Sequence, residues 1–247
     1  MEQPLAVIDT HAHLEEVEDL EDALDRAWQA GLEAVVAVAM DRAAGRFALD
    51  LAARQPRVWP AVGLHPWQVR AETWEAEVAF VAEHLHRACA LGEVGLDYKR
   101  KVPKDLQRAA LAAQLELAAR AGRTALVHCR YSERRVLDML AQAGVHAVFH
   151  WFAGEPALLE RLLAEGHYIS ATPSVATSPP HRAAVAACPL ERLVLETDAP
   201  VPHGGRYTTP ARVVETCRLV AALKGLTPQE VARRTTQNAR RLLAAQE

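Results

Sequence analysis

The sequence predicts an α/β fold of one domain, a barrel of eight parallel strands inside a ring of helices. Three observations lead to this prediction. Short apolar runs alternate with amphipathic, helix-like segments along the whole chain, which is the pattern of parallel strands covered on their outer face. Eight such repeats favour a closed (β/α)8 barrel, the TIM barrel, over an open doubly wound sheet. No linker-like stretch or change of composition divides the chain, so we expect a single domain over residues 1–247.

Each predicted strand is a short apolar run bounded by glycine, proline or polar residues. The first begins at Leu5 and ends in two histidines, His11 and His13. In order, the eight runs cover residues 5–13, 33–39, 58–63, 90–95, 124–128, 146–150, 167–171 and 192–198.

The segments between these runs have apolar residues at helical spacing and residues that commonly start or stop helices. Gly31 and Gly122 follow two of them as C-terminal stops, Pro56 ends another, and Thr227 precedes the last as an N-cap residue. After an acidic segment at 15–21 the first helical pattern ends at Gly31, and the others cover residues 41–54, 72–89, 105–121, 132–143, 156–165, 180–187, 210–224 and 228–246.

Composition and charge exclude several classes of protein. Half of the 247 residues are apolar, enough for a large core, and a formal charge of −3 gives no global basic field for nucleic acid or anionic lipid. Four scattered cysteines show no metal-binding or redox spacing and follow no secretory signal. No apolar run approaches the roughly 20 residues that span a bilayer. We therefore expect a reduced, cytoplasmic enzyme without a membrane partner, and the sequence is compatible with a monomer.

Polar residues that carry chemistry recur where the predicted strands end. In a (β/α)8 barrel the active site lies at the carboxyl ends of the strands, so these side chains should converge on one mouth. They are His11, His13, His65, Glu93, His128, His150, Glu196 and Asp198. By contrast His146 and His167 begin their strands, and we expect them to have structural roles at the opposite rim.

The spacing of His11 and His13 predicts a metal site. Alternate side chains of a strand share a face, so both imidazoles can point at one ion, although a lone His-x-His pair is often only a surface or capping feature. Six of these residues, His11, His13, Glu93, His128, His150 and Asp198, are candidate ligands, which exceeds the four of one tetrahedral zinc. We expect two divalent ions (Zn, Mg or Mn), bridged by the carboxylate of Glu93.

Six motifs resemble, in order and spacing, those of the TatD family of metal-dependent deoxyribonucleases, within the amidohydrolase superfamily. They are IDTHAH at 8–13, GLHP at 63–66, GEVGLDY at 92–98, HWFAG at 150–154, LETDAP at 195–200 and TQNARRLL at 236–243. The resemblance covers essentially the whole chain. Trp67, Trp151 and Ala153 depart from it, since the family often has His at the first position and usually has Cys and Ser at the other two.

The resemblance also implies roles for the residues. One ion would be held by His11, His13, Glu93 and Asp198, and the other by Glu93, His128 and His150. His65 and Glu196 would assist near the scissile phosphate. The implied activity is hydrolysis of phosphodiester bonds in DNA, of the 3'-5' exonuclease type, by water activated between two metal ions.

Within this hypothesis three residues are candidates for catalysis. Asp198 would orient or deprotonate the attacking water, with Glu196 on the same strand face as a partner or as a buried support for a ligand. His65, as a hydrogen-bond donor, could stabilise a non-bridging phosphate oxygen.

Basic and aromatic residues follow several of the predicted strands and could hold single-stranded DNA or a 3' end. The candidates for phosphate binding are Lys99, Arg100, Arg130 and Arg206, with Lys101, Lys104, Arg134 and Arg135 nearby. Tyr98, Trp67, Trp151 and Phe152 offer flat surfaces for unpaired bases. The alternatives are a solvated basic face and aromatic side chains used only in packing.

Two other functions remain open. The same barrel and ligands serve ester and amide hydrolysis, including deacylation of D-aminoacyl-tRNA, although many amide hydrolases of the superfamily bridge their metals with a modified lysine where this chain has Glu93. A non-catalytic metal scaffold is disfavoured, because structural zinc sites are usually closed shells rich in cysteine.

Overall fold

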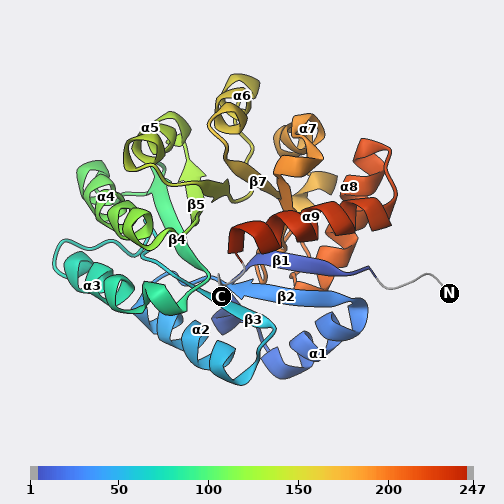
Figure 1. Cartoon of the computed structure of the whole chain (residues 1–247), viewed down its shortest axis with the longest axis horizontal. Helices are drawn as coiled ribbons and strands as arrows, with labels where there is room; N and C mark the ends of the chain where they lie inside the picture. Colours follow the sequence, from blue (N-terminus) through green and yellow to red (C-terminus); the bar gives the residue numbers. More distant parts are fainter. Residues whose placement is uncertain (1–4, 244–247) are drawn as a thin grey trace.

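Eight parallel strands lie side by side in chain order in the computed structural model, which describes residues 5–243, and form a nearly closed barrel (Figure 1). The predicted fold class is therefore confirmed. The strands are β1 Val7–Ala12, β2 Leu32–Ala37, β3 Val58–Val62, β4 Ala90–Asp97, β5 Ala125–Arg130, β6 Ala147–Phe149, β7 Tyr168–Ala171 and β8 Leu193–Leu195.

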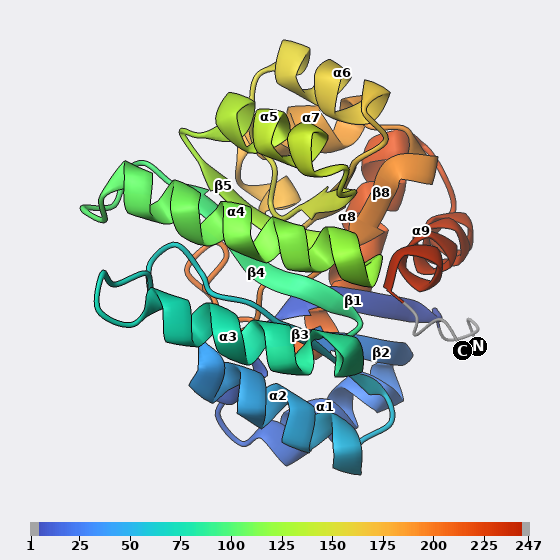
Figure 2. The ribbon, with the colours of Figure 1, turned by 60° about the vertical axis from the view of Figure 1, so that its left-hand side comes forward.

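Helices surround the barrel, one after each strand, with a further helix at the end (Figures 1 and 2). They are α1 Leu20–Ala30, α2 Arg42–Arg54, α3 Trp74–His84, α4 Lys104–Ala121, α5 Glu133–Ala143, α6 Pro156–Ala164, α7 Pro179–Ala187, α8 Val213–Lys224 and α9 Pro228–Leu243. Short 3-10 turns are η1 Leu14–Glu16, η2 Leu85–Arg87, η3 Pro173–Ala176, η4 Leu190–Arg192 and η5 Pro210–Arg212. No helix in residues 5–243 combines the length and apolarity needed to cross a membrane.

Some boundaries differ from those predicted. The helix expected over 72–89 ends at His84 and tightens into η2, because Ala88 already has the extended backbone that leads into β4. The helix expected from 210 begins as the turn η5. Pairing between β4 and β5 continues to Asp97 and Arg130, so both strands are longer than predicted. The end of the last predicted helix, residues 244–246, lies outside the described residues.

The barrel closes between its first and last strands. The backbone of Asp198, just after β8, donates to the carbonyl of His11 at 3.0 Å, and the N–H of His13 donates to the carbonyl of Ala199 at 2.7 Å. The buried carboxylate of Asp9 reinforces this seam by accepting hydrogen bonds from the hydroxyl of Thr197 at 2.6 Å and from its backbone N–H at 3.0 Å. Backbone hydrogen bonding to β1 therefore continues past the end of β8, in an irregular pattern, through the residues predicted to end this strand.

Apolar packing leaves one end of the barrel for polar chemistry. Alternate strand residues such as Ile8, Val36 and Val194 fill the interior, while their neighbours pack against the helices. Helix α9 adds Ala239 and Leu243 to the interior cluster and donates from Asn238 to the carbonyl of Leu193, where β8 begins. The amino ends of the strands are thus covered, and the carboxyl ends remain open.

We predict that Thr197→Val lowers the free energy of unfolding by about 1–3 kcal/mol, because valine keeps the shape but leaves a buried oxygen of Asp9 without its donor. Urea unfolding in EDTA measures this. The matched control is Thr235→Val, whose hydroxyl donates only to carbonyls of its own helix and whose loss should cost clearly less. Equal effects of the two substitutions would contradict a special role for the seam.

His167, at the rim where a structural role was expected, predicts a pH dependence of stability. It is buried and its Nδ1 accepts from the N–H of Ala147 at 3.2 Å, and burial lowers its pKa to about 4, below the value of about 6.5 in an unfolded chain. The unfolded state therefore takes up the proton first, and this stabilisation is complete above pH 6.5 and is lost as the pH falls towards 4.

In the variant His167→Asn, whose amide oxygen can replace Nδ1 as the acceptor, the free energy of unfolding should fall less steeply between pH 6.5 and 4. The difference in slope from the wild type should approach one proton in the middle of this window. Parallel curves for the two proteins would refute the assignment.

Candidate metal centre

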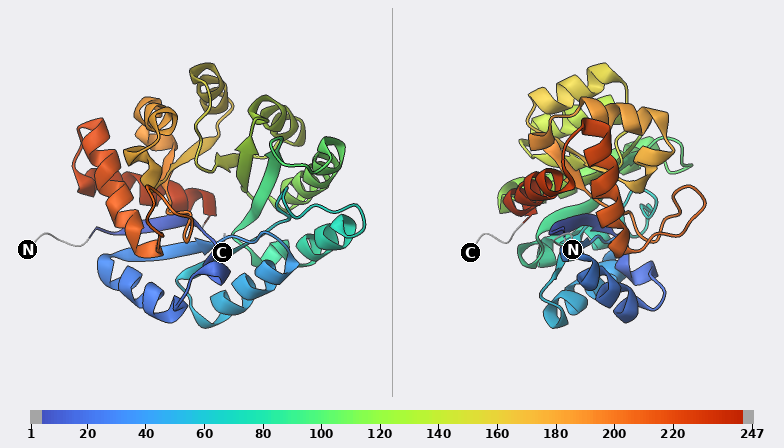
Figure 3. Two further views of the ribbon diagram at one scale, coloured as in Figure 1. Left: turned by 180° about the vertical axis from the view of Figure 1, so that it is seen from behind. Right: turned by 90° about the vertical axis from the view of Figure 1, so that its right-hand side faces the viewer.

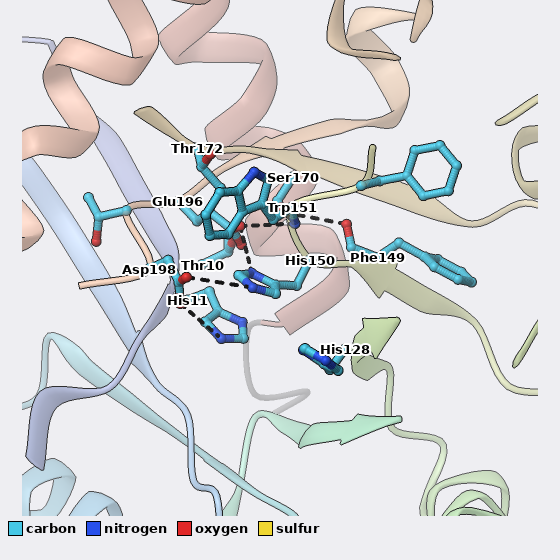
Figure 4. A network of polar contacts seen from close by, with 12 residues as sticks. Thr10, His11, His128, Phe149, His150, Trp151, Ser170, Thr172, Glu196 and Asp198 are labelled. Carbon is cyan, nitrogen blue, oxygen red and sulfur yellow. Dashed lines mark hydrogen bonds and ion pairs between the residues drawn. The ribbon is translucent and has the colours of Figure 1, made fainter. Parts of the chain in front are cut away.

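The histidines and carboxylates predicted at the strand ends gather at one end of the barrel. His11 lies in β1 and His13 just after it, Glu93 in β4, His128 in β5, and His65, His150, Glu196 and Asp198 follow β3, β6 and β8. Figure 4 shows His11, His150, Glu196 and Asp198 pointing toward one another, with His128 across from them. Apart from the partly exposed His128 and His150, all are buried.

Four of these side chains face one point. His11 Nε2 is 3.1 Å from Glu93 Oε2 and 3.8 Å from Asp198 Oδ1, and His13 Nε2 is 3.5 Å from each of these two oxygens. Neighbouring ligands of a tetrahedral ion with bonds of about 2.0–2.1 Å are separated by roughly 3.3 Å. The two imidazoles and two carboxylates therefore have the spacing and the chemistry of a set of ligands for one divalent ion.

The other oxygen of Glu93 faces a second group. Its Oε1 is 3.3 Å from His128 Nδ1 and 3.5 Å from His65 Nε2. Glu93 thus presents one oxygen to each group, which is the arrangement of a bridging carboxylate. The resemblance implied His150 rather than His65 beside Glu93 and His128; here the His150 ring stacks on His11 at 4.1 Å, with Nε2 3.7 Å from Asp198 Oδ2.

Hydrogen bonds select which nitrogen of each ring faces the centre as an acceptor. His150 Nδ1 lies 2.7 Å from Glu196 Oε1, and His128 Nε2 lies 3.2 Å from Asp97 Oδ2. A carboxylate can only accept, so each ring holds a proton on this outer nitrogen, and with a metal ion at the centre the inner nitrogen would present a lone pair to that ion. This orientation suits His150 and His128 to act as metal ligands.

His65 has the opposite polarity. The backbone N–H of Trp67 donates to its Nδ1 at 3.2 Å, and burial lowers the pKa of His65 to about 4, so the ring is neutral with its proton on Nε2. This N–H points at Glu93 Oε1. His65 thus brings a hydrogen-bond donor, rather than a lone pair, to the centre.

Asp97 supports the centre, although it was not among the candidate site residues predicted from the sequence. It is fully buried at the end of β4, and besides His128 its Oδ2 accepts from Trp67 Nε1 at 2.6 Å. The available signal was its position in the strand. Asp97 follows Gly95 by two residues and Glu93 by four, so it lies on the same strand face as both. Gly95 has a φ of +148°, and a Cβ there would lie 1.8 Å from the carbonyl oxygen of His128, so only glycine permits this approach of β4 to β5.

Electrostatics also fit a cationic occupant. Burial opposes protonation of His13 and His150, but Asp198 and Glu93 raise the pKa of His13 to about 9, and Glu196 and Asp198 raise that of His150 to about 10. The buried carboxylates therefore attract protons where no other cation is present. Divalent ions would supply the same compensation while leaving the imidazoles neutral as ligands.

The candidate substrate-binding residues lie in exposed positions around this end of the barrel. Lys99 and Arg100 follow β4, Arg130 ends β5, and Arg206 lies in the segment after β8 that projects from the barrel (Figure 3). The structure does not bring these side chains into contact with the cluster of histidines and carboxylates.

The aromatic candidates differ from one another. Phe152 is buried and packs edge-on against Phe149 at 6.2 Å, so it is a core residue and offers no surface to a base. Trp67 and Trp151 are half-buried beside the centre, and Tyr98 is half-buried under Lys104. The most exposed aromatic side chains on the described surface, Tyr131 and Tyr207, were not singled out from the sequence because neither belongs to a motif.

Comparisons with known proteins find relatives along the whole length of this chain. The family model described as TatD related DNase matches residues 8–244. An uncharacterized metal-dependent hydrolase TatD of Mycobacterium tuberculosis is 34% identical over 95% of this chain and 97% of its own. A 3'-5' ssDNA/RNA exonuclease TatD of Erwinia tasmaniensis is 34% identical over 91% of this chain and 93% of its own. The crystal structure of the TatD homolog YJJV of Escherichia coli superposes with a TM-score of 0.89 at 25% identity, covering 98% and 99% of the two chains.

We predict that Asp97→Asn weakens one of two divalent-ion sites by about 10–100-fold. The amide can donate to His128 Nε2, which moves the ring proton to Nδ1 and blocks the lone pair that faces Glu93. Calorimetric titration of the metal-free protein with Zn²⁺ or Mn²⁺ measures the affinities.

The control is Asp105→Asn, which removes an exposed carboxylate that pairs with Arg108 and should leave both affinities unchanged. Wild-type affinities in Asp97→Asn would show that Asp97 does not orient a ligand.

Proposed function

Because the chain belongs to the TatD-related DNase family of metal-dependent hydrolases, we propose that it is a nuclease that hydrolyses phosphodiester bonds of DNA at the 3' end of an unpaired strand. The observation that carries the proposal is the position of Glu93, whose two oxygens face two separate groups of histidines at the open end of the barrel. The substrate class is suggested by the name of the exonuclease relative and by the basic residues around this end.

The residues present fit two divalent ions, with Zn, Mg and Mn as the candidates. His11, His13, Glu93 and Asp198 would hold one ion, and Glu93 and His128, joined by His150 as the family resemblance implies, would hold the other. Such a pair supplies a lowered pKa for water and neutralises charge on a phosphate during in-line displacement.

The protein's own side chains would then handle protons and position the substrate. Asp198 Oδ1 lies with the His11–His13 group, and its other oxygen, Oδ2, lies 3.7 Å from His150 Nε2; we assign this carboxylate to accept a proton from the attacking water. Glu196 accepts from His150 and from the backbone N–H of Trp151 at 3.2 Å, so we assign it the role of holding His150 in place. His65 would donate from Nε2 to a non-bridging phosphate oxygen, whose developing charge this bond stabilises.

Lys99, Arg100, Arg130 and Arg206 are the proposed phosphate-binding residues. None of them forms an ion pair with a carboxylate within residues 5–243, so their charges are free for a polyanion. This local arrangement would let a chain of net charge −3 bind DNA. Affinity should accordingly fall as salt rises.

We predict that single-stranded DNA labelled at its 5' end is shortened stepwise by the protein in Mg²⁺, Mn²⁺ or Zn²⁺. His128→Ala should lower this rate by at least about 100-fold with an unchanged circular dichroism spectrum, because a ligand of the bridged centre is lost. The control is His146→Ala, an exposed histidine at the opposite rim, which should keep full activity. If DNA stays intact with every ion while an aminoacyl ester of tRNA is cleaved, the protein is a deacylase instead.

A further inference from the structure

A groove of about 460 Å³ opens on the outer side of Trp67. It lies between the loop that leads to α3 and the loop that leads to α4, which project on the same side of the barrel (Figure 2). Trp67, Arg70, Arg100, Lys101 and Leu106 are among its lining residues, and we call it the Trp67 groove.

The indole of Trp67 lines this groove and also contacts the candidate metal centre. The Trp67 ring meets the rings of His65 and His128 edge-on, with centroids 5.0 and 5.7 Å away, and its Nε1 donates to Asp97. A molecule in the groove would therefore lie against the indole that contacts His65, the residue proposed to meet the phosphate.

The groove combines positive charge with a flat surface. The Arg100 guanidinium lies over the Trp67 ring, with Cζ 3.9 Å from the ring centroid. Arg70 is fixed by donating to the backbone carbonyls of Trp67 at 2.7 Å and Val69 at 3.1 Å. In the part of the chain that the structure describes, Arg70, Arg100 and Lys101 have no carboxylate partner, so the groove is electropositive.

This surface matches the chemistry of a nucleotide. A base can stack on the Arg100 guanidinium, which itself lies over the Trp67 indole. Apolar side chains such as Leu106 line the remaining space, and Arg70 and Lys101 can pair with a phosphate. A volume of this size is also within the usual range for small-ligand sites, about 300–1,000 Å³.

We propose that the Trp67 groove holds the base of the nucleotide next to the scissile phosphate and thereby selects an unpaired strand. A base within a duplex is stacked between its neighbours and paired with the opposite strand, so it cannot enter the groove. This proposal rests on the nuclease function proposed above, which supplies the assumption that the bound strand is DNA.

The test measures the coupling between one base and one side chain. Binding of a short single-stranded oligonucleotide, labelled at its 5' end, is followed by fluorescence anisotropy in EDTA, and cleavage is followed separately in Mn²⁺. Two further oligonucleotides each lack one base, at the last or the penultimate nucleotide. The variant is Arg100→Lys, which keeps the charge but removes the guanidinium plane, and Arg87→Lys, on an exposed residue before β4, is its control.

For the wild type and Arg87→Lys, loss of the base at one of the two positions should weaken binding about tenfold, the size of one stacking contact. For Arg100→Lys, the same loss should change affinity less than twofold, because the guanidinium plane on which the base stacks is already gone.

If Arg100→Lys abolishes the effect of the missing base and the strand is also cleaved in Mn²⁺, both proposals are supported. If it abolishes that effect but no strand is cleaved, the groove is supported and the nuclease proposal is wrong. If the strand is cleaved but Arg100→Lys does not change the effect of a missing base at either position, the groove proposal is wrong and the nuclease proposal holds. Failure to bind any of the strands overturns the groove as well.

Discussion

The closure of the barrel between β1 and the segment after β8 is the constraint on which the candidate site depends. It brings His11 and His13 against Asp198, although more than 180 residues separate them in the chain. The contact is made by polar groups: Asp9 accepts from Thr197, and backbone groups pair across an irregular seam. Asp198 itself has a φ of +56°, and its carboxylate faces the two histidines where closure occurs.

Burial of the carboxylates is the cost that this arrangement must offset. Burial alone would raise the pKa of Glu93, Glu196 and Asp198, but the facing histidines hold all three below their ordinary values. A cluster with this much buried charge gains most when a divalent ion enters it, since a buried ion needs an opposite charge nearby. The same buried charges that cost free energy on folding therefore favour metal binding, and this connects the energetics of the fold to the chemistry of the site.

The positions of the strands and the residues at the open end could be predicted from sequence, because apolar runs locate strands and parallel strands bring their carboxyl ends together. Ring orientation could not be predicted. Whether His65 or His150 lies beside Glu93, and which nitrogen each ring presents, depends on contacts with Trp67, Glu196 and other strands. Asp97 was missed for the same reason, since its value lies in reaching His128 across the β4–β5 pair. Phe152 follows the motif histidine yet turns into the core, which spacing alone does not reveal.

Trp67 shows how the loops can adapt a common centre to a substrate. Its indole N–H bonds to the carboxylate that orients His128, its backbone N–H sets the proton on His65, and its ring carries Arg100 at the groove. A residue with these three contacts cannot be exchanged for substrate fit alone, because a change also alters a ligand and a donor at the centre. Arg100 and Lys101 line the groove and, within residues 5–243, form no ion pair with the carboxylates of the centre, so they are free of that constraint. Variation in substrate choice should therefore concentrate in the loop after β4, while the position of Trp67 changes only together with the chemistry of the centre.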